Sequence, residues 1–225
     1  MKKYLAIIII LFTSLLAEEE HFAVSSFGLP VADLVLQRVD SVYEDIDIEI
    51  LRYSVRTIGV TDWIFSINNS YEFFIRKKDR KIVFHKKKIQ QINVIQTYSE
   101  RICRDKIYYS TGDSMVCPEL FTHPLVLIFD DRFFSTEKLP KYVQIEGEVF
   151  RGHFDIDKSR DDINENSVAR RLDLEYIRGE AVTKITDIFS WKISDPEAGK
   201  YAVYDKESGE LITAFLKFGS MTVKA

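Results

Sequence analysis

The strongest constraint on the fold is an alternation of apolar residues with a period of two. In residues 46–57 (IDIEILRYSVRT), three isoleucines at even positions share one side, and Leu51, Tyr53 and Val55 share the other. Successive side chains of a β-strand point to opposite faces, so this pattern predicts a strand. Apolar residues make up 46% of the chain and aromatic residues 13%, which is enough to build a sizeable core around such strands.

The same β-branched and aromatic composition continues to the end of the chain and predicts further strands. Polar turn clusters separate them at residues 68–70 (NNS), 78–80 (KDR) and 205–210 (DKESGE). We expect the first of these turns to join residues 62–67 and 71–77 in a hairpin.

Two segments favour helices. One covers residues 122–134, with Thr122 as the cap and Pro124 in the first turn, where a missing N–H costs little. A shorter helix is expected within residues 28–36. Because sheets twist, we predict a mainly β fold: an antiparallel meander curled into a half-barrel or sandwich, with one or two short helices. Residues 18–225 would form a single strand-rich domain.

Residues 1–17 have the layout of a secretory signal peptide. Lys2 and Lys3 precede an apolar segment, Tyr4–Phe12, and Ala17 stands before three glutamates. The apolar segment is shorter than the roughly 20 residues of an ordinary transmembrane helix. We expect cleavage after Ala17 and a periplasmic or extracellular protein, with an uncleaved anchor as the alternative.

The only two cysteines, Cys103 and Cys117, flank a predicted hairpin. Residues 106–110 read as a strand, 111–113 (TGD) as a turn and 114–117 as the returning strand. Disulfides persist in an oxidising compartment, and a hairpin of this length could bring the two Cα atoms within bonding range. We therefore predict a disulfide, with buried thiols or a reactive site as the alternatives. A metal site needs more ligands than this stretch supplies.

Four stretches carry a resemblance to a known family: residues 50–67, 84–98, 123–129 and 190–216. Over these stretches the chain resembles the bacterial envelope family catalogued as domain of unknown function 3108. The resemblance implies export and a strand-rich single domain. It implies no catalytic residue, because that family has no agreed activity.

Three features of that family have counterparts in this sequence. Its first strand runs into a small residue, here Gly59, before a second strand. A short central helix follows, here residues 124–134, and the tail pairs two strands around a polar turn, here residues 205–209. The cysteine hairpin and the basic run near Lys86 are peculiar to this chain.

A basic run is the most distinctive surface feature. Without Lys2 and Lys3 the chain has 29 basic and 35 acidic side chains, a net charge of −6, which argues against a general nucleic-acid binder. One interpretation of the run is a docking patch for an anionic membrane surface. The interpretation that we favour is a solvated strand protected by lysines from pairing with other chains. The run consists of Arg76, Lys77, Lys78, Arg80, Lys81, Lys86, Lys87 and Lys88.

The aromatic residues have two interpretations as well. A curved sheet lined by them could enclose an apolar ligand, but buried aromatics more often fill the core, which is the reading that we favour. The candidates for an apolar ligand site are Trp63, Phe65, Phe73, Phe189 and Trp191.

Catalytic and metal-binding signatures are missing from the sequence. There is no Gly-x-Ser-x-Gly, His-Glu-x-x-His or phosphate-binding glycine loop. Asp155, Asp157, Ser159 and Asp161 alternate as in a calcium loop, but Arg160 stands where such a loop needs glycine, so a solvated acidic loop is the better reading. We predict no cofactor and no metal, and the sequence leaves the oligomeric state open.

Two functions follow from these features. The first is an exported envelope protein that binds a lipid-like ligand or an envelope partner without catalysis. The alternative is an exported hydrolase whose site assembles from scattered residues. We favour the first, because it accounts for the missing motifs, the strands and the aromatic content.

Overall fold

One large sheet forms the body of the protein. The computed structural model describes residues 18–117, 121–130, 142–157, 164–183, 187, 195, 198–216 and 221–224. Of these residues, 67% lie in strands, the sheet is not closed, and two short helices complete the secondary structure of this part of the chain. The predicted fold class is confirmed. Residues 1–17, the expected signal peptide, lie outside the described residues.

The first half of the chain is a meander of eight strands, each antiparallel to its predecessor. Turns of two to five residues join most of them, and helix α1 (Gly59–Ile64) joins the third to the fourth. The strands are β1 (Glu18–Ser26), β2 (Leu29–Tyr43), β3 (Ile46–Thr57), β4 (Asn68–Arg76), β5 (Ile82–Gln91), β6 (Val94–Cys103), β7 (Lys106–Tyr109) and β8 (Ser114–Val116).

The second half supplies the remaining strands in the reverse spatial order. They are β9 (Phe121–Thr122), β10 (Tyr142–Ile145), β11 (Glu148–Ile156), β12 (Ser167–Arg178), β13 (Lys200–Asp205), β14 (Leu211–Leu216) and β15 (Met221–Lys224). The complete order is β8-β7-β6-β5-β4-β3-β2-β1-β15-β14-β13-β12-β11-β10-β9. The two halves meet where β1 pairs antiparallel with β15, and the two edges, β8 and β9, are close in sequence.

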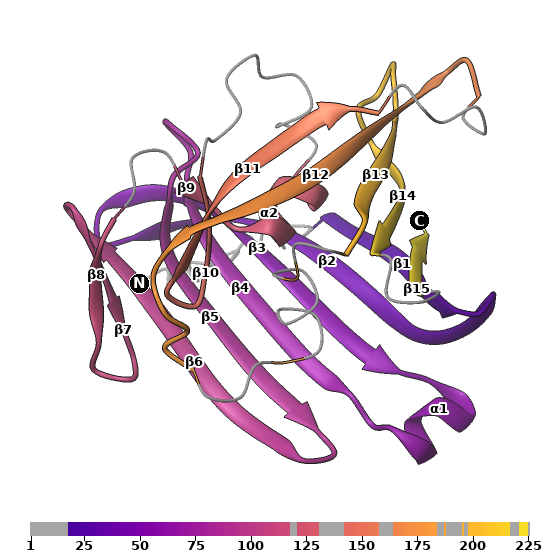
Figure 1. Ribbon diagram of the computed structural model, residues 1–225, viewed down its shortest axis with the longest axis horizontal. Coiled ribbons are helices and arrows are strands. Elements are labelled where there is room, and N and C mark those ends of the chain that lie inside the picture. Colours follow the sequence, from indigo (N-terminus) through magenta and orange to yellow (C-terminus); the bar gives the residue numbers. More distant parts are fainter. Residues whose placement is uncertain are drawn as a thin grey trace, which may run out of the picture.

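Helix α2 (Pro124–Phe129) fills the space inside the curl, between β2–β5 and β11–β13 (Figure 1). All six of its residues are buried. The ring of Phe129 packs edge-on against Phe22 and Tyr53, at 5.5 Å from each. Tyr204 donates a hydrogen bond to the carbonyl of Ile128 at 2.7 Å. Because a helix that is apolar on every side must be buried, its sequence explains its central position.

Two arginines hold the carboxyl end of α2. Asp130 follows the helix and is fully buried, and it forms an ion pair with Arg80 and lies 3.7 Å from Arg38. Arg38 also donates to the carbonyl of Phe129 at 2.9 Å. Cations at this position complement the helix dipole and satisfy a terminal carbonyl.

Several predicted elements are confirmed and others are wrong. The strand predicted for residues 46–57 is β3, with Leu51, Tyr53 and Val55 buried. Residues 28–36 are not helical, because Ala32, Leu34 and Leu36 are buried at a period of two within β2.

The remaining corrections concern segment boundaries and a helix cap. The turn predicted for residues 68–70 begins β4, and residues 62–64 of the strand expected at 62–67 belong to α1. Gly59 adopts a φ of 58°, which turns the chain out of β3. Helix α2 is capped by the Nδ1 atom of His123 rather than by Thr122, and residues 131–134 lie outside the described residues. In the described part of the chain, neither helix has the length and apolarity needed to cross a bilayer.

Candidate functional site

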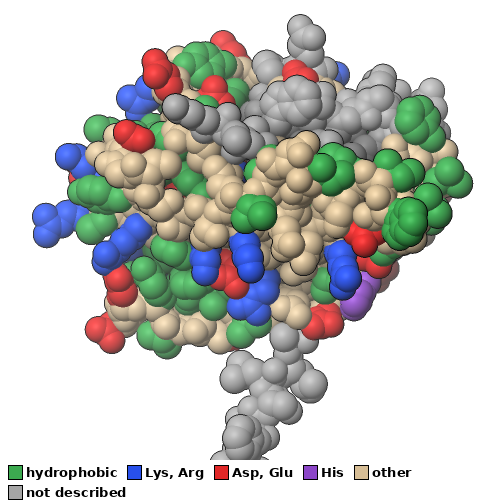
Figure 2. All heavy atoms as spheres, turned by 90° about the horizontal axis from the view of Figure 1, so that it is seen from below, with side chains coloured by type: hydrophobic (Ala, Val, Ile, Leu, Met, Phe, Trp, Pro, Cys, Tyr) green, Lys and Arg blue, Asp and Glu red, His purple; other side chains and the backbone are tan. Residues whose placement is uncertain are grey.

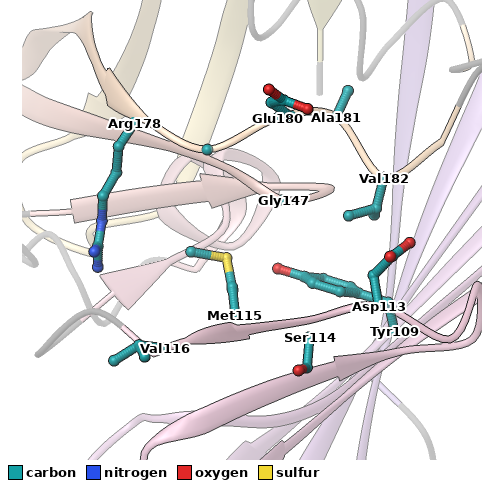
Figure 3. A pocket seen from close by; sticks show the side chains of 11 residues that line it. Tyr109, Asp113, Ser114, Met115, Val116, Gly147, Arg178, Glu180, Ala181 and Val182 are labelled. Atoms are coloured by element: carbon teal, nitrogen blue, oxygen red, sulfur yellow. The ribbon is translucent and has the colours of Figure 1, made fainter.

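A pocket of about 500 Å³ lies beside the open edge strand β8. Its other wall is formed by Gly147 and by the end of β12 with the residues that follow it, 178–182. It therefore lies between one edge of the sheet and the segments around the β10–β11 turn and the end of β12. The lining residues are Tyr109, Asp113, Ser114, Met115, Val116, Gly147, Arg178, Gly179, Glu180, Ala181 and Val182 (Figure 3).

The edge of β8 presents backbone polar groups on the side away from β7. Tyr109 N donates to Asp113 O at 3.0 Å, and Cys117 N donates to Asp105 O at 2.7 Å. Backbone groups alternate in direction along a strand, so those of Ser114 and Val116 point away from β7. In the described part of the chain, β8 is the last strand of the sheet on that side. A segment of extended backbone could therefore pair there.

Two glycines let the opposite wall come together. A Cβ atom on Gly179 would lie 2.1 Å from the carbonyl oxygen of Gly147, and one on Gly147 would lie 2.4 Å from that of Glu180. Both glycines have positive φ, 100° and 101°. Larger residues would push the two segments apart, so the shape of the pocket depends on both positions.

The pocket is apolar in its depth and charged at its rim. Figure 3 shows the Tyr109 ring between Met115 of β8 and Val182 of the opposite wall. Tyr109 is buried, whereas Arg178 and Glu180 are exposed. Such a site can take one apolar side chain while its mouth contacts polar groups.

A closed polar network lies behind Tyr109. Gln144 donates to the Tyr109 hydroxyl at 3.4 Å and to Glu100 at 3.2 Å, and Tyr98 donates to Glu100 at 2.6 Å. His85 Nδ1 lies 3.8 Å from Glu100. Burial opposes ionisation of Glu100, but the attraction of His85 and the hydrogen bonds from Tyr98 and Gln144 outweigh it, and its pKa lies below the usual value.

Burial and the negative charge of Glu100 both act on the two tyrosines. They raise the pKa values of Tyr98 and Tyr109 far above the ordinary phenol value, so both hydroxyls stay protonated.

Lys87 forms a second buried network beside the first. Its ammonium pairs with Glu146 and lies 3.1 Å from Asp187. Tyr71 donates to Asp187 at 2.6 Å, and Thr183 donates to Glu146. Glu146 lies in the β10–β11 turn, so this network ties the second half of the chain to the inner face of β4 and β5.

The ionisable groups of both networks are separated from the pocket. His85, Lys87, Glu100, Glu146 and Asp187 are each at most 6% exposed, and none of them lines it. Tyr109 alone belongs to both the pocket and a network. Among the described residues, no group of three His, Cys, Asp or Glu side chains is placed to hold a metal ion.

The predicted disulfide is not formed, and both cysteines are thiols. Cys103 ends β6, and β7 lies between β6 and β8, after which Cys117 follows. Two strand spacings of about 4.8 Å separate the cysteines, beyond the roughly 7 Å limit between bonded Cα atoms. The predicted hairpin is correct, because the turn at residues 111–113 joins β7 to β8, but Cys103 lies on the strand before it. Burial raises the pKa of the Cys117 thiol to about 11.

The structure divides the basic run into two groups. Arg76, Lys77, Lys78, Arg80 and Lys81 lie around the β4–β5 turn, whereas the three consecutive lysines lie on β5. In the turn group, Arg76 pairs with Asp79 at 2.7 Å, Lys77 pairs with Asp40 at 2.7 Å, and Arg80 is held by Glu49 and Asp130.

On β5, Lys86 and Lys88 are exposed and Lys87 is buried. Lys87 therefore belongs to the interior and not to a docking patch. The alternating pattern of the strand separates these neighbours onto two faces.

The structure also separates the aromatic candidates. Trp63 is 94% and Phe65 38% exposed around α1, whereas Phe73 is fully buried and stacks on His85 at 4.3 Å. Phe73 therefore fills the core. The other two aromatic candidates, Phe189 and Trp191, lie outside the described residues. The same holds for residues 158–163, which make up most of the predicted acidic loop.

Sequence reasoning missed the pocket. Its walls come from strands about 35 to 70 residues apart, so no local pattern joins them. The one signal in the sequence was the presence of Gly147 and Gly179 near strand ends. Glycines there indicate backbone turns, but they do not indicate that the two turns contact each other.

No family model, no curated protein and no solved structure matches this chain.

Proposed function

We propose that this chain is an exported, non-catalytic binding protein of the cell envelope, and that it holds an extended peptide segment of a partner protein beside β8. The observation that carries the proposal is the open edge of β8 at a pocket of about 500 Å³. An added strand would bond to the backbone of Ser114 and Val116 and place a side chain between Tyr109 and Val182. Strand addition to a sheet edge is an established mode of peptide binding.

A peptide fits this site better than a lipid-like ligand. An acyl chain needs a deep apolar cavity, but α2 fills the interior of the curl, and the pocket lining includes Tyr109, whose hydroxyl accepts a hydrogen bond from Gln144. A hydrolase is less well supported, because the buried carboxylates and Lys87 already have partners within the fold and none of them lines the pocket. We also propose membership of the domain of unknown function 3108 family, on the strength of the stretches quoted above.

The test uses peptides selected for binding. Seven-residue peptides are selected by phage display against the purified protein, and the affinity of a selected peptide is measured by fluorescence anisotropy. Val116→Pro removes an outward N–H without affecting a bond to β7, whereas Val116→Ala keeps that N–H. We expect the proline variant to bind about tenfold more weakly, the equivalent of roughly 1.4 kcal/mol for a lost hydrogen bond.

Two outcomes would contradict the proposal. Equal affinity of the proline and alanine variants would show that the peptide does not pair with β8. A lipid that stays bound in native mass spectrometry, and that Met115→Trp displaces from the pocket, would favour the lipid-like alternative.

A further inference from the structure

Exposed apolar side chains lie on three alternate connections, all at one end of the first meander. The connections are the β1–β2 turn at Phe27, helix α1 and the β5–β6 turn at Ile92. In an antiparallel meander every second connection lies at the same end, so these three lie along one rim of the sheet. Figure 1 shows α1 projecting at the lower right of the sheet, beyond the ends of the strands.

These side chains are exposed to an unusual degree. Trp63 is 94% exposed, Ile95 88%, Phe27 86%, Val60 76%, Ile64 72% and Ile92 52%. We call these six residues the apolar rim. Single exposed apolar residues are common, but a cluster of large ones marks a surface that meets an apolar partner.

The opposite end of the same meander has a different composition. Its turns are Glu44–Asp45, Lys77–Arg80 and Arg104–Asp105, in which nearly every residue is charged. Asp62, which lies within α1 between Val60 and Trp63, accepts a hydrogen bond from Thr57 at 2.7 Å.

The same contrast is visible on the surface. Figure 2 shows apolar side chains along the right-hand margin, the side on which α1 lies in Figure 1, and most Lys and Arg at the centre and left.

The spacing of the apolar rim favours a fluid apolar surface over a protein partner. From β1 to β6 there are five strand spacings of about 4.8 Å, so the three connections extend over roughly 24 Å. They are separate connections spread along one rim, whereas protein interfaces concentrate their affinity in packed central residues. Tryptophan at such a tip is typical of the region between lipid headgroups and acyl chains.

We infer that the apolar rim docks on the interfacial region of a lipid bilayer, with the charged end of the meander facing water. This inference does not depend on the peptide pocket beside β8. Insertion of apolar tips, unlike attraction to lysine, does not depend on anionic lipid.

The test uses the full chain and vesicles of phosphatidylcholine. The rim variant carries Val60→Ser, Trp63→Ser and Ile64→Ser, all at exposed positions. The matched control carries Val42→Ser and Ile156→Ser, which are 65% and 54% exposed but lie outside the apolar rim. We expect vesicle sedimentation of the wild-type and control proteins, and a partition coefficient at least about tenfold lower for the rim variant.

A second readout reports the position of Trp63. The chain has two tryptophans, so Trp191→Phe leaves Trp63 as the only one. Its fluorescence should shift to shorter wavelength when phosphatidylcholine vesicles are added, and the shift should persist at about 1 M salt, where the Debye length is only about 3 Å.

Four results would overturn the inference. They are the absence of binding by the wild-type protein, equal binding by the rim variant, loss of binding at high salt, and self-association of the wild-type protein that the rim variant abolishes. The last result would assign the apolar rim to a second copy of the chain.

Discussion

At the scale of single residues, Lys86, Lys87 and Lys88 show how a strand gives identical neighbours different roles. Lys87 shares the inner face of β5 with His85 and Ile89, and the other two lysines face water. The period of two along this strand is enough to predict from the sequence that Lys87 lies on the same face as Ile89. Its partners Glu146 and Asp187 are 59 and 100 residues away, and no local pattern predicts them.

Replacing Lys87 should therefore destabilise the fold. Lys87→Gln leaves Glu146 and Asp187 buried without their shared cation, and we expect a loss of about 3 to 5 kcal/mol in the free energy of unfolding. Lys86→Gln is the matched control and should change it by less than about 0.5 kcal/mol. Urea unfolding of both variants tests this. If the Lys87→Gln and Lys86→Gln variants have equal free energies of unfolding, the buried lysine contributes nothing to stability.

His123 should make the stability depend on pH. Burial, with the nearby His85 and Lys87, lowers the pKa of His123 well below its usual value. In the unfolded chain His123 takes up a proton as the pH falls through about 6.5, whereas in the folded chain it stays neutral. The free energy of unfolding therefore has its full value above that pH. It should fall by up to about 1.4 kcal/mol per pH unit below it.

The check is a comparison of urea unfolding at neutral and mildly acidic pH. His123→Asn keeps an acceptor for the N–H of Leu125 but cannot titrate, so it should flatten this dependence. His21→Asn, whose side chain is 70% exposed in the wild type, should leave the dependence as it is. A wild-type slope that survives in His123→Asn would assign the effect to another group.

At the scale of elements, α2 organises the interior of the curl. Pro124 and the apolar run were sufficient to predict a helix here, because proline is favoured in a first turn. Its cap was predicted one residue too early, since Thr122 pairs in β9 and leaves the capping role to His123. Residues 28–36 were assigned to a helix because a short apolar run does not distinguish a buried strand from a helix.

Truncating Phe129 tests the role of α2. Its ring contacts Phe22 and Tyr53, and Phe129→Ala should cost about 3 to 5 kcal/mol of unfolding free energy by leaving a cavity. Phe27→Ala removes an equal ring that is 86% exposed and should cost less than about 0.5 kcal/mol. Similar losses from both would contradict the central position of the helix.

At the scale of the whole molecule, composition predicted the sheet but not how its surface is divided. The basic run was treated as one unit, although ion pairs with Asp79, Asp40 and Glu49 occupy most of its turn. Which end of the meander is apolar depends on the direction of every strand, and a single misplaced turn, such as the one predicted at residues 68–70, changes that assignment.

The remaining exposed lysines allow a separate test of attraction to anionic membranes. Lys86→Gln with Lys88→Gln should leave folding intact and weaken binding to vesicles containing phosphatidylglycerol by up to about 2 kcal/mol at low salt. Vesicle sedimentation over a salt series measures the difference, which should vanish as salt rises. Unchanged binding at low salt would exclude these lysines from membrane attraction. The predicted protection of an edge strand is wrong, because β5 pairs with β4 on one side and with β6 on the other.

The pairing of β1 with β15 has a consequence for the order of folding. Nearly every other strand pairs with its neighbour in sequence, so hairpins can form as the chain is made. The second partner of β1, however, is β15, which follows 195 residues later (Met221 against Ser26), and four residue pairs, Ala23 with Lys224 through Ser26 with Met221, join the halves. Until β15 is made, one edge of β1 is an unprotected template for foreign strands. The period of greatest aggregation risk therefore ends only when β15 pairs with β1.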